Sequence, residues 1–187
     1  MDALTPRRVT PLTPSALADD QRQLYDAITT GPRARAPQHF TLTRADGSLT
    51  GPFDLFLRAP AVGAALQELG ATLRFRTGLD DRSREMAILL VAARWDSAFE
   101  RESHEAVARG IGITEVEIRA LRAADLAPFE GREVAVGRTV LALLDGDLDD
   151  EAWASGVGAL GETVLFELTA LVGYYATLAL QMRVFRV

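Results

Sequence analysis

The stretch WDSAFERESHEAVARGIG, residues 95–112, decides how this chain is interpreted, because its period is helical while its polarity is mixed. At about 100° per residue, one sector of the helix combines polar and apolar residues, namely Ser97, Glu100, His104, Val107 and Ile111. The opposite sector carries the charges expected to face solvent, namely Glu102, Glu105 and Arg109. A helix that turns a carboxylate and one of only two histidines toward its buried side indicates a functional site.

Two glutamates are candidates to act on this histidine. Glu100 and His104 are four residues apart, so their side chains can touch on a helix. A carboxylate beside an imidazole raises its proton affinity and fixes which ring nitrogen faces outward, as a general acid/base pair requires. On the preceding helix, Glu85 lies on the same side as Ile88 and Leu89. If the two helices pack as a hairpin, Glu85 also approaches His104.

Purely structural roles also account for the positions of these residues, without any catalytic function. Ser97 and Glu100 have the spacing of a capping box, and Glu85 lies in a first turn, where carboxylates favour the helix dipole. A single histidine on an apolar face is often a hydrogen-bonded core residue. A metal site is a weak alternative, because no second histidine lies nearby, and we expect no metal. His39, in the long loop, is assigned no role.

The remainder of the chain is also predicted to be helical. Thr13 and Pro14 open a first helix that ends at Gly31, and residues 31–52 form a long loop with a turn at Asp46-Gly47. From Pro52 onward, apolar spacing and end signals predict helices over 61–77, 82–95, 97–110, 114–123, 131–145, 149–159 and 162–184. We therefore predict an all-α protein with an N-terminal helix and loop extension over 1–51. The helical domain covers 52–187, and the whole forms one compact unit.

Composition excludes several classes of function. The chain has 187 residues, is 48% apolar and has a formal net charge of −6, as expected of a soluble globular protein without a nucleic-acid partner. All 20 basic residues are arginine, so lysine Schiff-base chemistry and a P-loop lysine are excluded. The absence of cysteine excludes disulfides, thiolate nucleophiles and cysteine metal sites.

Two segments bear on location. The N-terminus MDALTPRRVT has no apolar core of a secretory signal, so we expect a cytoplasmic protein. Residues 164–182 are apolar enough to resemble a membrane span, but they contain Glu167 and Gln181. We expect this stretch to be a core or subunit-interface helix, with no membrane partner.

Two motifs carry a family resemblance. RSREMAILLVAARW at 82–95, followed by E-x-x-x-HEAVARGIGITEVEIRAL from Glu100, resembles the carboxymuconolactone decarboxylase family, which includes alkyl hydroperoxidase D. The resemblance is strongest over 52–123. It implies an alkyl hydroperoxidase D-like helical bundle and a homo-oligomer, as a dimer, trimer or hexamer.

The resemblance also implies roles for individual residues. The peroxidase branch of the family uses a glutamate, then a C-x-x-C pair, then a histidine. Here Glu85 and His104 match the glutamate and the histidine, but Ser97 and Glu100 occupy the cysteine positions. Thiol peroxidase activity is therefore disfavoured. The decarboxylase branch lacks the cysteine pair and has a glutamate four residues before its histidine, as Glu100 and His104 are placed.

The sequence thus favours a cofactor-independent acid/base enzyme acting on a small lactone or keto-acid-like carboxylate. We expect His104 to donate or accept the proton, Glu100 to orient it, Glu85 to tune its charge and Ser97 to supply a hydrogen bond. Weaker candidates for substrate binding are Trp95, Arg94, Phe53 and Tyr174. The alternative is a non-catalytic oligomeric binding protein on the same scaffold.

Overall fold

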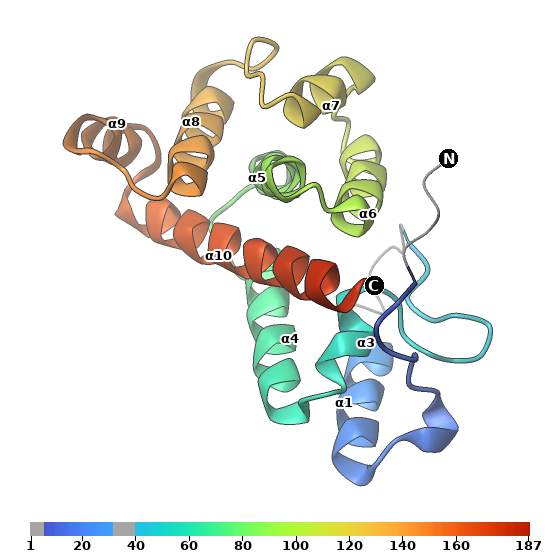
Figure 1. Cartoon of the computed structure of the whole chain (residues 1–187). Helices are drawn as coiled ribbons and strands as arrows, with labels where there is room; N and C mark the ends of the chain where they lie inside the picture. The colour runs from blue at the N-terminus through green and yellow to red at the C-terminus, as the bar shows by residue number, and fades with distance from the viewer. Residues whose placement is uncertain (1–5, 32–39) are drawn as a thin grey trace. The chain divides into compact units, whose positions relative to one another are not determined.

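The regular structure of this protein is helical, as the sequence predicts. The computed structural model describes residues 6–31 and 40–187, and within these ranges it contains helices and a single isolated β-bridge (Figure 1). The all-α fold class is therefore confirmed. The chain divides into two compact units, one formed by Met1–Thr72 with Leu180–Val187 and the other by Leu73–Ala179.

The first unit contains a short 3₁₀-helix η1 (Pro14–Ala16) and helices α1 (Asp19–Thr30), α3 (Pro52–Phe56) and most of α4 (Pro60–Phe75). The predicted start of the first helix at Thr13 is wrong. The chain is extended at Ala18, and α1 begins one residue later. Two aspartates in its first turn favour this start electrostatically, and the side chain of Gln21 accepts a hydrogen bond from the N–H of Ala18.

The predicted turn at Asp46-Gly47 is present. Gly47 has a φ of 82°, and Thr43 and Leu49 on its two sides form an antiparallel bridge. The carboxylate of Asp46 accepts hydrogen bonds from both the N–H and the hydroxyl of Ser48. Residues 32–39, which include His39 and the start of the predicted long loop, lie outside the described residues.

The second unit is organised around helix α5 (Asp81–Trp95). Residues 83–92 of α5 are all buried, and Figure 1 shows α5 in the centre of this unit. It packs against three of the helices that follow it, namely α6 (Ala98–Gly110), α7 (Glu115–Arg122) and α8 (Gly131–Asp145). Helix α9 (Asp150–Leu160) packs against α8. A helix buried on every side explains why the sequence of α5 is apolar around its whole circumference.

Ionic contacts join these helices at their polar edges. The guanidinium of Arg82 on α5 bonds Glu117 of α7 and Glu133 of α8, each at 2.6 Å, and the carbonyl of Gly112 at 3.0 Å. On α6, Glu105 was expected to face solvent, but it is buried. That expectation is wrong because Arg122 of α7 donates two hydrogen bonds to its carboxylate, both at 2.6 Å.

Helix α10 (Glu162–Phe185) is the longest helix described. Its length and apolar composition would allow it to cross a membrane, and it is the one described helix of which this is true. However, Leu165, Leu168 and Leu171 are almost completely buried inside the protein. These side chains give α10 the character of a core helix.

Candidate functional site

A sharp connection between α5 and α6 determines where the polar residues of the site lie. Asp96 ends α5 in the left-handed conformation, with a φ of 47°, which aspartate tolerates better than most residues. The N–H of Ser97 then donates to the carbonyl of Ala92 at 2.9 Å, which closes the last turn. Because the chain reverses here, residues early in α5 come to face the middle of α6.

The connection brings Glu85 of α5 and His104 of α6 into contact. Nδ1 of His104 and Oε2 of Glu85 are 2.6 Å apart. A carboxylate can only accept, so Nδ1 carries the proton and Nε2 is left as the nitrogen available for proton transfer. The Glu85 side chain is almost fully buried, whereas that of His104 is 14% exposed. The imidazole is therefore held from the inside of the fold and reaches solvent at its edge.

The electrostatics of Glu85 favour its ionised form. Burial alone would raise the pKa of Glu85, but the charge of His104 and the hydrogen bond from its ring outweigh this effect, and the pKa of Glu85 is lowered. Arg84, whose Nε lies 3.4 Å from Oε1 of Glu85, and Arg74 act in the same direction. The effect of Arg84 on Glu85 could not be predicted from the sequence, because it depends on the burial of both side chains.

Two tyrosines of α10 complete the surroundings of the imidazole. The ring of Tyr175 meets that of His104 edge-on, with centroids 5.2 Å apart and an interplanar angle of 87°. Tyr174, the tyrosine proposed to line a pocket, is buried and meets Tyr175 edge-on at 5.2 Å. Tyr174 therefore supports the ring that contacts His104. The edge-on contacts fix the orientation of the imidazole in addition to the bond from Glu85.

Glu100 is placed differently from the expectation. Both of its carboxyl oxygens are buried, and neither has a hydrogen-bond partner among the residues that the structure describes. The prediction that Glu100 orients His104 is wrong in this respect, because Glu85 makes that bond. Burial raises the pKa of Glu100 to about 8. Ser97 is the N-cap of α6 but makes no side-chain capping bond, so the capping-box interpretation is also wrong.

The family model that matches the chain covers these residues. It is described as the Carboxymuconolactone decarboxylase family, and it matches residues 60–142. This segment of the chain is similar to that family. No curated protein matches the chain. The matched segment runs from the start of α4 into α8 and contains Glu85, Ser97, Glu100 and His104.

Within the matched segment, the absence of cysteine has a direct chemical meaning. Ser97 and Glu100 open α6, where a dithiol pair would have to lie for peroxidase chemistry of the kind implied by the sequence resemblance. Neither a hydroxyl nor a carboxyl can replace a thiolate that attacks a peroxide. The part of this segment that remains suited to chemistry is the imidazole of His104 with the carboxylate of Glu85.

The other three of the weaker candidates for substrate binding are Arg94, Trp95 and Phe53. Arg94 is exposed and forms an ion pair with Asp145 at 3.1 Å, while Trp95 is the partly buried last residue of α5. Phe53 lies in the other unit, where it stacks on Phe40 at 6.1 Å and meets Phe56 edge-on at 5.8 Å.

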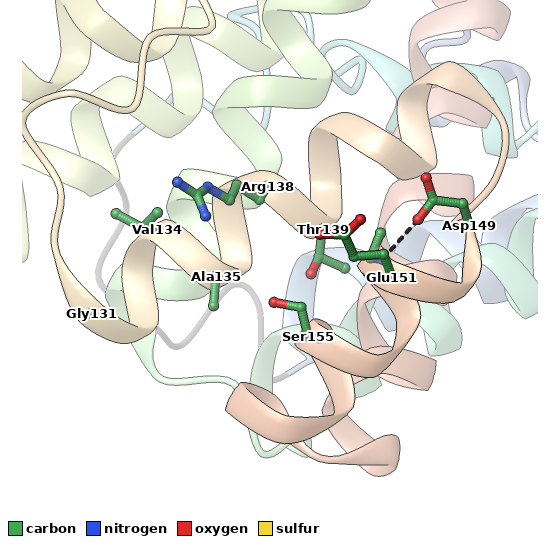
Figure 2. Close-up of a pocket in the computed structure, with 10 residues that line it drawn as sticks. Gly131, Val134, Ala135, Arg138, Thr139, Asp149, Glu151 and Ser155 are labelled. Atoms are coloured by element: carbon green, nitrogen blue, oxygen red, sulfur yellow. Dashed lines mark hydrogen bonds between the residues drawn. The ribbon is translucent and has the colours of Figure 1, made fainter.

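A separate hollow of about 380 Å³ lies between α8 and α9 (Figure 2). Its polar lining residues are Arg138, Thr139, Asp149, Glu151 and Ser155. The carboxylate of Asp149 is already bonded to the N–H of Ala152 as the cap of α9. None of the residues predicted to form the site lines this hollow. Among the described residues, no group of three metal-ligating side chains is present.

Proposed function

We propose that this protein is an acid/base enzyme with a carboxymuconolactone decarboxylase-like activity on a small lactone or keto-acid-like carboxylate. The observation that carries the proposal is the 2.6 Å bond between Glu85 and His104, with Nε2 unbonded among the described residues. An imidazole held in one tautomer by a buried carboxylate is suited to move a proton at Nε2. The proposal requires no cofactor, because proton transfer alone completes the step.

The proposed step is a proton transfer next to a carboxylate that leaves as CO2. When the C–C bond to the carboxylate breaks, its electron pair stays on the adjacent carbon, which is stabilised by a neighbouring carbonyl. The imidazolium of His104 then delivers a proton from Nε2 to that carbon. Glu85 acts as a positioning residue, since its negative charge stabilises the imidazolium and its hydrogen bond holds the ring in place.

The test is the activity of the purified protein on a panel of γ-lactone carboxylates and β-keto acids, with release of CO2 as the measurement. His104→Gln should abolish turnover and retain the helical circular-dichroism spectrum. His39→Gln, which replaces the only other histidine, is the matched control and should retain activity. Equal activity of His104→Gln and the unchanged protein would contradict the proposal.

The alternative proposal is a non-catalytic binding protein on the same scaffold. The limited exposure of the imidazole, 14%, favours this function, because a structural network needs no access for substrate. A protein that binds the lactone carboxylates but releases no CO2 from any of them would support it. A His104→Gln variant that fails to fold would point to the same conclusion.

We also propose that the chain forms a homo-oligomer through α10. One side of this helix is exposed and uncharged along Phe166, Thr169, Gly173 and Thr177. The hydroxyls of Thr169 and Thr177 donate to carbonyls of their own helix, at 2.7 and 2.8 Å. With these donors satisfied, the face can be covered by a second copy without leaving buried polar groups unbonded.

A further inference from the structure

The carboxyl group of Glu100 differs from the other buried carboxyl groups of the same helix pair. Glu85 is bonded to His104, and Glu105 is bonded to Arg122. Glu100 is equally buried, with 2% of the residue exposed, yet no hydrogen bond reaches either oxygen from the described residues. An unsatisfied buried carboxyl costs free energy, and this one lies one helical turn before His104, which favours a role in binding a molecule from outside the chain.

The position of Glu100 links it to the proposed acid/base site. It lies one helical turn before His104 on the same side of α6. Ser97 lies one turn earlier and is also buried, so three polar side chains follow each other along the inner side of this helix.

The surroundings of Glu100 keep it uncharged. No charged group among the described residues contributes to the shift of its pKa, and burial is the only cause. The charged groups closest along these helices have other partners, since Glu85 of α5 is bonded to His104 and Arg122 of α7 is bonded to Glu105. The pKa of Glu85 is lowered and that of Glu100 is raised to about 8. Near neutral pH the site therefore combines one ionised carboxylate with one neutral carboxylic acid.

We propose that Glu100 is a substrate-binding residue whose neutral carboxyl group donates a hydrogen bond to an anionic oxygen of a small carboxylate. The inference rests on the proposed function of the same site, and it assigns Glu100 a role other than orienting His104. A neutral acid can approach an anion without repulsion, whereas an ionised glutamate would exclude it. The proton stays on Glu100 in this role, so no co-reactant is needed.

Binding of the anion should weaken at high pH. When Glu100 ionises, it loses its donor and repels the bound anion, so affinity falls as the pH rises through about 8. Above that pH, each further unit should weaken binding by about tenfold. Glutamine keeps an N–H donor and the shape of glutamate but does not ionise. Glu100→Gln should therefore bind the anion at high pH as tightly as at neutral pH. Because His104 is present in both proteins, it does not account for a difference between them.

The test is calorimetric titration of the full chain with 5-oxotetrahydrofuran-2-carboxylate, a saturated lactone carboxylate, at pH 6, 7, 8 and 9. The unchanged protein should lose about fivefold in affinity between the last two points, and Glu100→Gln should lose less than about twofold. Glu102→Gln, an exposed glutamate on the same helix, is the control and should follow the unchanged protein. Identical pH profiles for Glu100→Gln and the unchanged protein would overturn the inference, as would an absence of binding at every pH.

A second measurement separates this inference from the proposed function. The infrared spectrum at neutral pH should contain a protonated carboxyl band that disappears in Glu100→Gln and persists in Glu102→Gln. Absence of that band overturns the inference even if His104→Gln abolishes turnover. Conversely, binding with the expected pH profile and no turnover on any substrate would retain the role of Glu100 and reject the proposed reaction.

Discussion

Three glutamates of similar burial show how neighbouring residues set the state of a carboxyl group. Glu105 is bonded by two arginines, and Glu85 by an imidazole, so the pKa of each is lowered. Glu100 lacks any such partner among the described residues, and burial raises its pKa. The protonation of the site therefore follows from which glutamate has a cationic neighbour, and burial alone would predict the same state for all three.

This difference predicts how the stability of the protein depends on pH. The pKa of Glu100 is raised in the folded state, so its protonated form stabilises the fold fully below the unfolded pKa of 4.5. That stabilisation is lost as the pH rises through about 8. Relative to Glu100→Gln, the free energy of unfolding of the unchanged protein should fall by roughly 5 kcal/mol at most over this range. Urea unfolding at pH 5, 7 and 9 measures the difference.

Glu102→Gln provides the comparison for this prediction. Glu102 is exposed on the same helix, so its removal should shift stability by a similar small amount at every pH. A stability difference between Glu100→Gln and the unchanged protein that stays constant from pH 5 to 9 would show that Glu100 is ionised throughout.

At the residue scale, the sequence was sufficient to identify which side chains meet but insufficient to assign their bonds. Helical spacing placed Glu85 and His104 on facing sides of a hairpin, and they are bonded. The same spacing placed Glu105 toward solvent, because a helical wheel takes no account of Arg122, which comes from another helix 17 residues later. The choice between Glu85 and Glu100 as the partner of the imidazole depends on the hairpin geometry at Asp96, which spacing along one helix does not contain.

At the element scale, the ends of most helices could be predicted because they carry local signals. Thr114 and Glu117 form a capping box at the predicted start of α7, and Gly146 follows the predicted end of α8. The first helix was the exception. Thr13 and Pro14 look like a helix start, but the chain forms only one 3₁₀ turn before α1 begins at Asp19. The signals of the true start are weaker in the sequence, since Ala18 has no side chain that can cap a helix and the start relies on Asp19, Asp20 and Gln21.

Glycines within helices give a prediction at this scale, because two of them have opposite surroundings. A Cβ on Gly63 of α4 would lie 2.8 Å from both the carbonyl carbon and the Cβ of Phe56, which belongs to α3. Since backbone cannot yield as a flexible side chain can, Gly63→Ala should destabilise the protein by about 1–3 kcal/mol. The midpoint of denaturant unfolding measures this effect.

Gly158 of α9 is the matched control. No atom lies within 4 Å of a Cβ built there, so alanine meets only solvent. Gly158→Ala should stabilise the protein by about 0.5–1 kcal/mol through the higher helix propensity of alanine. If Gly63→Ala stabilises the protein as much as Gly158→Ala does, the close approach of α3 and α4 is not present in solution.

At the scale of the whole molecule, an exposed apolar side chain indicates an interface with another copy only where the surrounding surface lacks charge. Phe166 on α10 is 75% exposed and Val116 on α7 is 57% exposed. Val116 is followed on its side of the helix by Arg119, which is charged and exposed. Phe166 is followed on its side of the helix by Thr169, Gly173 and Thr177, with no charge among them. The two surfaces therefore differ in their capacity to be buried against another copy.

This contrast predicts which substitution changes the state of assembly. The unchanged protein should have a solution mass that is a multiple of its chain mass of 20.3 kDa, measured by light scattering after size exclusion. Phe166→Ser should reduce that mass, because it removes the largest apolar side chain from the proposed interface and leaves a polar group in its place. Val116→Ser deletes a comparably exposed apolar side chain from a charged surface, so it should leave the mass unchanged. A monomeric protein, or an equal loss of assembly in both variants, would show that α10 does not bind a second copy.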